Sequence, residues 1–159
     1  EATINEQNYV SLKMNDVKSV ESGDGFFYLN TGSPHYVKMV ENLKNYNVFE
    51  EGKRIRNSDR FLVEGTNVNF IEKTDAGVFV RTYERGVEGE TLSCGTGVTA
   101  SALVAAMKGV SNEKNYCKVS TFGGDLNVKF DKVLENNFYN IWLEGPAEFV
   151  FNGSINLKD

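Results

Sequence analysis

Short segments in which apolar and polar residues alternate, or in which β-branched and aromatic residues cluster, recur along the chain. This pattern is typical of strands, whose side chains point to opposite faces in turn. Nine segments are expected to form strands, at 9–14, 25–30, 35–40, 67–72, 77–84, 117–122, 126–130, 141–145 and 147–151. Gly, Asn and Asp cluster in FGGD (122–125) and ENNFYN (135–140), where they favour hairpin turns, so neighbouring strands are expected to be mostly antiparallel.

The segment SPHYVKMVENLKNY (33–46) carries both strand and helix signals. Val37, Val40 and Leu43 recur at a spacing of three, as on one face of a helix. We predict that a strand end runs into a short first helix within Tyr36–Tyr46.

A second helix is expected over Gly95–Lys108, GTGVTASALVAAMK. It has no Lys, Arg, Asp or Glu before Lys108, so no face of it suits water and it should be buried. Small residues would let strands approach it closely, at Gly97, Ala100, Ser101, Ala102, Ala105 and Ala106. The expected fold is α+β, with a mostly antiparallel sheet curled around a central buried helix.

Composition indicates a soluble globular chain with one domain, residues 1–159, of which 40% are hydrophobic. A net charge of -5 gives no basic surface for phosphates or anionic lipid, so neither nucleic acid nor a membrane is an expected partner. The N-terminal residues have no basic and apolar leader pattern, and no segment approaches the length of a membrane-spanning helix. The missing initiator Met suggests a processed chain or a piece of a longer protein.

The two cysteines, Cys94 and Cys117, are too few for a disulfide framework and lack the spacing of a metal or redox pair. We therefore expect a cytoplasmic protein. Cys117 lies in a strand pattern and is interpreted as structural.

Cys94 stands directly before Gly-Thr-Gly, at the start of the expected second helix. Unpaired backbone N–H groups and the helix dipole favour a thiolate there and should lower the thiol pKa. Gly95 and Gly97 leave their amides uncovered and Thr96 adds a hydroxyl, which suits a bound carboxylate or phosphate. This pattern favours chemistry at the carbon attached to a carboxylate, with the thiolate as base.

Three other interpretations stay open at this point. Cys94 can be a small buried residue beside packing glycines, although the polar loop ERGVEGETLS before it favours an accessible site. GTGVTA matches the dinucleotide fingerprint GxGxxA, but the polar EGETLSC segment is not the strand that this fingerprint needs. A cysteine hydrolase dyad would use His35, the only histidine, without any accompanying triad or oxyanion signature.

Four blocks, in order, resemble the C-terminal half of the diaminopimelate epimerase family: TGSPHYV (31–37), TNVNF (66–70), VRTYERGVEGETLSCGTGVTASAL (80–103) and GPAEFVFNGSI (145–155). The YERG block followed by Cys-Gly-Thr-Gly is the most specific. The resemblance implies a pseudo-symmetric pair of domains with the active site between them. It also implies interconversion of LL- and meso-diaminopimelate, in lysine and peptidoglycan precursor synthesis, with neither pyridoxal phosphate nor a metal.

The family uses two cysteines, one on each side of the α-carbon, to remove and return a proton. Cys94 resembles one of them, and Glu84 resembles the acidic residue associated with it. His35 resembles the histidine associated with the partner cysteine. Gly95 and Thr96 resemble the helix-start donors to the reacting carboxylate.

Asn67 and Arg85 resemble ligands of the distal carboxylate, and Glu84 also resembles a contact of the distal ammonium. Ser33 stands where the family often has Asn before Pro-His, and we expect it to make a shorter substrate contact. The loop RGVEGE is one residue longer than the commoner form. From the residues alone, His35 can equally be structural, Asn67 a turn residue, and Glu84 with Arg85 a solvated pair.

The implied partners are diaminopimelate and the missing N-terminal half with the second cysteine, while a homodimer stays open. The isolated chain is expected to be inactive. Two alternatives remain, namely a racemase of another amino acid and a non-catalytic substrate-binding domain.

Overall fold

The computed structural model describes residues 1–134 and 136–156. Its strands are β1 (Ala2–Ile4), β2 (Tyr9–Lys13), β3 (Glu21–Ser22), β4 (Phe27–Asn30), β5 (Pro34–Met39), β6 (Asn67–Thr74), β7 (Gly77–Glu84), β8 (Gly89–Thr91), β9 (Tyr116–Thr121), β10 (Gly124–Leu134) and β11 (Asn137–Pro146). The helices are the 3-10 turn η1 (Leu43–Asn45), α1 (Val48–Arg56) and α2 (Gly95–Met107). The strands form one sheet in the order β1-β2-β11-β10-β9-β7-β6-β5-β4-β3, and β8 pairs with β7.

The sheet is mixed. Most neighbouring strands are antiparallel, but β5 runs parallel to β6 and β7 runs parallel to β9. Parallel neighbours need a crossover connection, and these two crossovers contain α1 and α2 respectively. The structure therefore confirms the α+β class, with two parallel pairings that the hairpin signals did not predict.

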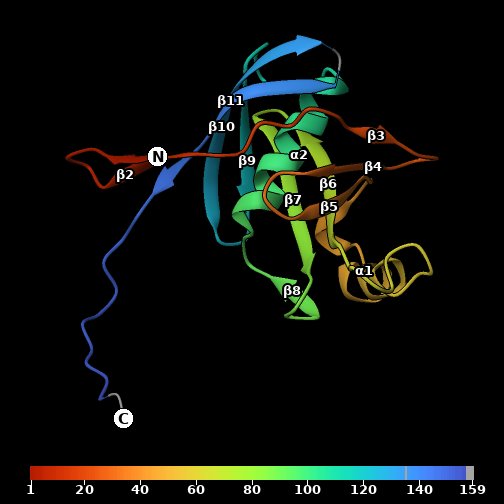
Figure 1. Cartoon of the computed structure of the whole chain (residues 1–159), viewed down its shortest axis with the longest axis horizontal. Coiled ribbons are helices and arrows are strands. Elements are labelled where there is room, and N and C mark those ends of the chain that lie inside the picture. The colour runs from red at the N-terminus through yellow and green to blue at the C-terminus, as the bar shows by residue number, and fades with distance from the viewer. Residues whose placement is uncertain (135, 157–159) are drawn as a thin grey trace.

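Helix α2 is buried from Gly97 through Ala105. It contacts β4 to β7 and β9 to β11, and Figure 1 shows it lying among these strands. Its first turn lies very close to β6, because a Cβ atom added at Gly97 would be only 2.4 Å from Nδ2 of Asn69. The glycine thus allows the start of the helix to approach the polar residues of β6.

Eight of the nine predicted strand segments fall in strands, and the ninth, 147–151, is wrong. At the start of this segment, the Ala147 N–H donates a hydrogen bond of 2.8 Å to the carbonyl of Asn8, the residue before β2. Beyond it the backbone has no strand partner among the described residues, and the tail leaves the body of the molecule (Figure 1). Large apolar side chains in the tail are exposed, namely Phe149, Val150, Phe151 and Ile155.

The predicted strand end that runs into a short helix within Tyr36–Tyr46 is confirmed in part, because the helix is only the 3-10 turn η1. Residues 34–39 form β5, in which His35 and Val37 are buried at alternate positions, and only η1 is helical. The first α-helix is α1, which sequence analysis missed. Asn47 caps it by accepting a hydrogen bond from the Glu50 N–H at 3.3 Å.

None of the described helices is long and apolar enough to cross a membrane.

Candidate active site

Five of the predicted site residues meet where the first turn of α2 faces the starts of β5 and β6. Cys94 is the N-cap residue of α2, with an extended backbone (φ -135°, ψ 109°). His35 and Asn67 are register partners on the parallel strands β5 and β6. The turn before β5 is tied to the helix by the Thr31 hydroxyl, which donates to the Thr96 carbonyl at 2.8 Å.

Ser33 connects these residues through its hydroxyl group. Its Oγ lies 3.0 Å from Nε2 of His35 and 3.1 Å from Oγ1 of Thr96. It also accepts a hydrogen bond from Nδ2 of Asn67 at 3.1 Å. Oγ1 of Thr96 in turn lies 3.6 Å from Sγ of Cys94, so the thiol and the imidazole are joined through two hydroxyls rather than by the direct contact of a hydrolase dyad.

His35 is fully buried and held on its other side by a residue that sequence analysis missed. Its Nδ1 lies 2.8 Å from Oδ1 of Asn69, whose Nδ2 donates to Oγ1 of Thr82 at 2.7 Å. The sequence did carry a signal, because Asn67 and Asn69 occupy alternate positions of an otherwise apolar strand segment, and a buried amide requires partners.

Burial lowers the pKa of His35 to about 4, since a charged imidazolium would lose its hydration. The hydrogen bond with Asn69 opposes this shift, and the positive charge of Arg85 adds to it. The imidazole is therefore neutral at neutral pH.

Cys94 is only 8% exposed, and burial raises the pKa of its thiol. The Thr96 hydroxyl and the backbone N–H groups of Gly97 and Thr96 lower it, while the negative charge of Glu84 raises it. The predicted lowering of this pKa is therefore wrong, because loss of hydration outweighs the donors at the helix start. At rest Cys94 is a thiol.

Arg85 and Glu84 lie beside this network. The Arg85 N–H donates to Oδ1 of Asn67 at 2.9 Å, and Nη1 of Arg85 donates to the Glu64 carbonyl at 2.8 Å. Glu84 ends β7 and lies near enough to Cys94 to raise the thiol pKa. Within the described part of the chain, no ion pair joins Glu84 to Arg85, and both side chains are half-buried.

A family model for diaminopimelate epimerase matches residues 27–150, a range that contains all of these side chains. The chain belongs to the diaminopimelate epimerase family. It is 49% identical to the diaminopimelate epimerase of Flavobacterium psychrophilum over 156 residues, which cover 97% of this chain and 60% of that protein. It is 40% identical to the Aquifex aeolicus enzyme over 129 residues, which cover 80% of this chain and 45% of that protein. The chain thus spans about half the length of these relatives.

This member of the diaminopimelate epimerase family also shares its fold with a solved structure of a probable proline racemase from Agrobacterium radiobacter. The TM-score is 0.70 at 15% sequence identity, over 99% of this chain and 56% of the other. At that identity the likeness shows the fold alone.

Cys117, the other cysteine of this family member's chain, is fully buried in β9. Its thiol donates only to the Lys118 carbonyl among the described residues. Burial raises its pKa to about 12, which agrees with the structural role predicted for it. Within residues 1–134 and 136–156, no cluster of three His, Cys, Asp or Glu side chains could hold a metal ion.

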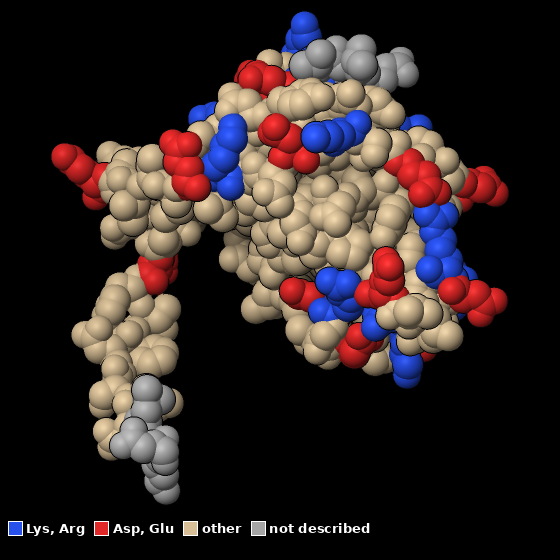
Figure 2. All heavy atoms as spheres, viewed as in Figure 1, with Lys and Arg blue, Asp and Glu red and all other residues tan. Residues whose placement is uncertain are grey.

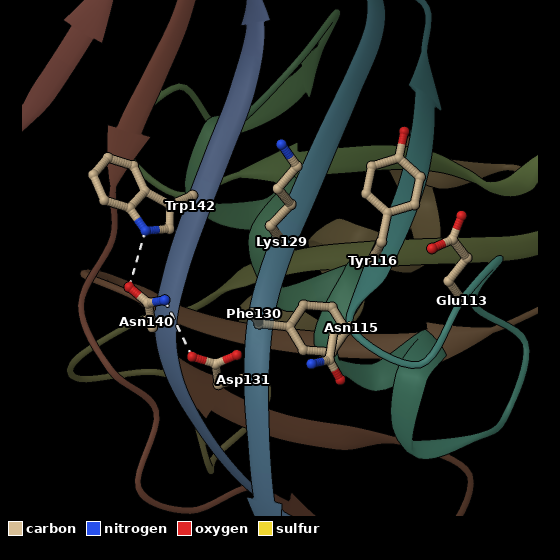
Figure 3. A pocket seen from close by; sticks show the side chains of 8 residues that line it. All are labelled: Glu113, Asn115, Tyr116, Lys129, Phe130, Asp131, Asn140 and Trp142. Atoms are coloured by element: carbon tan, nitrogen blue, oxygen red, sulfur yellow. Dashed lines mark hydrogen bonds between the residues drawn. The ribbon is translucent and has the colours of Figure 1, made fainter.

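A surface hollow of about 540 Å³ lies over β9, β10 and β11, and contains none of the predicted site residues (Figure 3). Tyr116, Lys129 and Trp142 line it. The side-chain amide of Asn140, which also lines the hollow, is hydrogen-bonded at both ends. Its Oδ1 accepts from Nε1 of Trp142 at 3.0 Å, and its Nδ2 donates to Asp131 at 3.1 Å. The predicted site residues lie instead around the start of α2.

Proposed function

We propose that the chain is the C-terminal half of an epimerase that interconverts LL- and meso-diaminopimelate by two-base proton transfer. Family membership supports this reaction, and one structural observation carries the role of the site: Cys94 is the N-cap residue of α2, and the backbone N–H groups of Thr96 and Gly97 are close enough to its thiol to lower the pKa. A thiol in that position can exchange a proton with the α-carbon of an amino acid. No pyridoxal phosphate or metal is required for this chemistry.

The first turn of α2 supplies the stabilisation that α-proton removal needs. When the α-proton leaves, negative charge moves onto the carboxylate of the substrate. N–H groups at a helix start, here those of Gly95 and Thr96, stabilise such charge without reorganising. A substrate carboxylate bound at Gly95 and Thr96 would therefore place its α-carbon beside Cys94.

The raised thiol pKa gives Cys94 a defined starting role. In a two-base scheme one cysteine begins as a thiol and the other as a thiolate. Because burial keeps Cys94 protonated at neutral pH, we assign it the role of acid at the start of the cycle, and the cysteine of the other half the role of base.

Asn67, Glu84 and Arg85 are proposed to bind the far end of a two-ended substrate. Nη1 of Arg85 donates a hydrogen bond to the Glu64 carbonyl, and the other N–H groups of the guanidinium can bind a carboxylate. Asn67 holds both the Arg85 backbone and the Ser33 hydroxyl, so it fixes the distance between the two ends of the site.

The other half of the protein is the proposed partner of this chain. The relatives are longer, and the exposed tail after β11 suits burial against a further domain, because Phe149 and Phe151 are 77% and 78% exposed. Figure 2 shows this tail standing apart from the body with few charged residues on it. In this proposal the strands packed around α2 form one unit of a pseudo-symmetric pair, and the isolated chain is inactive.

The test is an epimerisation assay in D₂O on the full-length protein that contains both halves. We expect it to interconvert the two diaminopimelate isomers without added cofactor and to place deuterium at the α-carbon of the product. Cys94→Ala should abolish the reaction, whereas the control Cys117→Ala should retain it if the protein stays folded. Epimerisation by Cys94→Ala at the unmodified rate would overturn the proposal in favour of a substrate-binding domain.

A further inference from the structure

The carboxylate of Glu88 ties the loop between β7 and β8 to helix α1. Its Oε1 lies 3.3 Å from Nε of Arg56, the last residue of α1, and accepts from the Gly86 N–H at 3.2 Å. Its Oε2 accepts from the Tyr83 hydroxyl of β7 at 3.3 Å. Glu88 has a φ of 55°, in the left-handed region that residues other than glycine adopt at a cost. Partners from the loop, the strand and the helix therefore hold this residue in place.

Arg56, the partner of Glu88, lies beside a second arginine, Arg85. Gly65 lies against both, because a Cβ atom added there would be 2.6 Å from Cδ of Arg85 and 2.9 Å from Cζ of Arg56. The Arg56 side chain is only 17% exposed, and its Nη1 donates to the Phe61 carbonyl at 3.2 Å. Two positive charges this close repel one another unless an anion balances them. Glu88 supplies that anion for Arg56.

The ion pairs divide the two arginines into one that is balanced and one that is available. Arg56 pairs with Glu88, whereas Arg85 takes part in none of the ion pairs found within residues 1–134 and 136–156. Glu84, the residue before Arg85, forms none of these ion pairs either. Two acidic and two basic side chains therefore gather at this end of the site, and their charges sum to zero.

Glu88 also holds the backbone around Arg85. The Gly86 N–H, which donates to Glu88, belongs to the peptide unit that follows Arg85. The N–H of Arg85 itself donates to Oδ1 of Asn67 at 2.9 Å. The backbone is thus tied on both sides of Arg85, once by the amide of Asn67 and once by the carboxylate of Glu88.

We propose that Glu88 is a specificity-determining residue that, by balancing Arg56, fits the far end of the site to a zwitterion, an inference that rests on the proposed epimerase function. The far end of diaminopimelate carries one ammonium and one carboxylate, so it has no net charge. Glu84 and Arg85 would bind these two groups, and Glu88 acts through Arg56 and the loop without touching the substrate. Without Glu88 the site has one excess positive charge and favours an end that is a carboxylate alone.

The test compares the binding of two ligands to the full-length protein that contains both halves. LL-Diaminopimelate carries the distal ammonium, whereas 2-aminopimelate has the same carbon chain and carboxylates without it. Calorimetry in a Cys94→Ala background gives a Kd for each ligand without any reaction, and the ratio of the two values measures specificity.

Glu88→Gln should shift this ratio toward 2-aminopimelate by about 2- to 5-fold, the size expected for a partly exposed charge. The glutamine keeps an oxygen for the Gly86 N–H, so charge is the main property that changes. The shift should decrease as salt is added, because ions screen exposed charges. Glu88→Asp keeps the charge and should keep the ratio.

Removal of Arg56 gives the opposite charge change and a rescue. Arg56→Gln alone should shift the ratio toward diaminopimelate. The double variant Glu88→Gln with Arg56→Gln has no excess charge and should return the ratio to within about 2-fold of the starting value. Damage to local structure by Glu88→Gln would not be repaired by a second substitution, so the rescue separates charge from folding.

The matched control is Glu51→Gln, which removes the same charge from another ion pair of α1, formed with Arg54 at 2.8 Å. It should leave the ratio unchanged. An unchanged ratio in Glu88→Gln, or a double variant that stays shifted, would overturn the role of Glu88. A full-length protein that binds diaminopimelate but does not epimerise it would overturn the proposed function alone, and the ratio would still decide the role of Glu88. A protein that binds neither ligand would overturn both.

Discussion

Ser33 is the residue at which Thr96 of the helix start, the imidazole of His35 and the amide of Asn67 come together. Its hydroxyl accepts from Asn67 while it bonds His35 and Thr96. A hydroxyl can donate and accept at one atom, whereas the Asn that the family often has there separates its donor from its acceptor. The serine therefore suits a row of hydrogen bonds, and its direct contact with the substrate stays a prediction.

His35 should make stability depend on pH. Its pKa is about 4 in the folded chain and near 6.5 when unfolded, so between these values the unfolded state binds more protons. Its contribution is complete above pH 6.5 and is lost as pH falls toward 4, by about 3 kcal/mol in all. Urea unfolding at several pH values measures this. His35→Gln should lose that part of the pH dependence, and an unchanged slope would contradict the assignment.

Cys94 should react slowly for a thiol at a helix start. Because burial raises its pKa, the rate of alkylation should still be rising with pH above 8.5, the ordinary thiol value. Cys117, with a pKa of about 12 and no exposure, should react later still. Mass spectrometry after timed labelling at several pH values distinguishes the two. A Cys94 rate that levels off by pH 8 would restore the lowered pKa expected from the sequence.

At the scale of elements, prediction succeeded where the pattern is local. The absence of charge before Lys108 gave α2 its bounds to within one residue, and alternation located eight strands. Helix α1 was missed although its signals are local too, with Asn47 as cap and acidic residues in the first turn. The parallel pairing of β5 with β6 could not be predicted, because register between distant strands depends on the packing of the whole sheet.

Helix α2 should not tolerate a side chain at Gly97. The added Cβ atom of Gly97→Ala would lie 2.4 Å from Nδ2 of Asn69 and would displace the amide that holds His35. We expect a loss of about 1–3 kcal/mol in the free energy of unfolding, as for other overpacked sites. Gly89→Ala is the control, since nothing lies within 4 Å of its added Cβ atom. Equal stability of the two variants in urea would show that the helix start can move away from β6.

At the scale of the whole molecule, the proposed reaction needs two cysteines, one on each side of the α-carbon, and Cys94 would supply one of them. The other cysteine of the chain, Cys117, is fully buried in β9 and hydrogen-bonds none of the predicted site residues. Sequence resemblance predicted residues that the structure brings together around the start of α2. It did not identify Asn69 or the order in which Ser33 and Thr96 connect, because those depend on how α2 packs against β6.

The tail after β11 should become ordered only when the other half is present. Phe149 and Phe151 follow a strand-like pattern, and apolar side chains this exposed are stabilised by burial against a partner. Amide hydrogen exchange over 147–156 should therefore be fast in this chain and protected in the full-length protein. Phe151→Asp should lower the free energy of unfolding of the full-length protein and leave that of this chain unchanged. Leu62→Asp, at another exposed apolar residue, is the control for adding a charge. Fast exchange of the tail in both proteins would show that its apolar residues do not contact the other half.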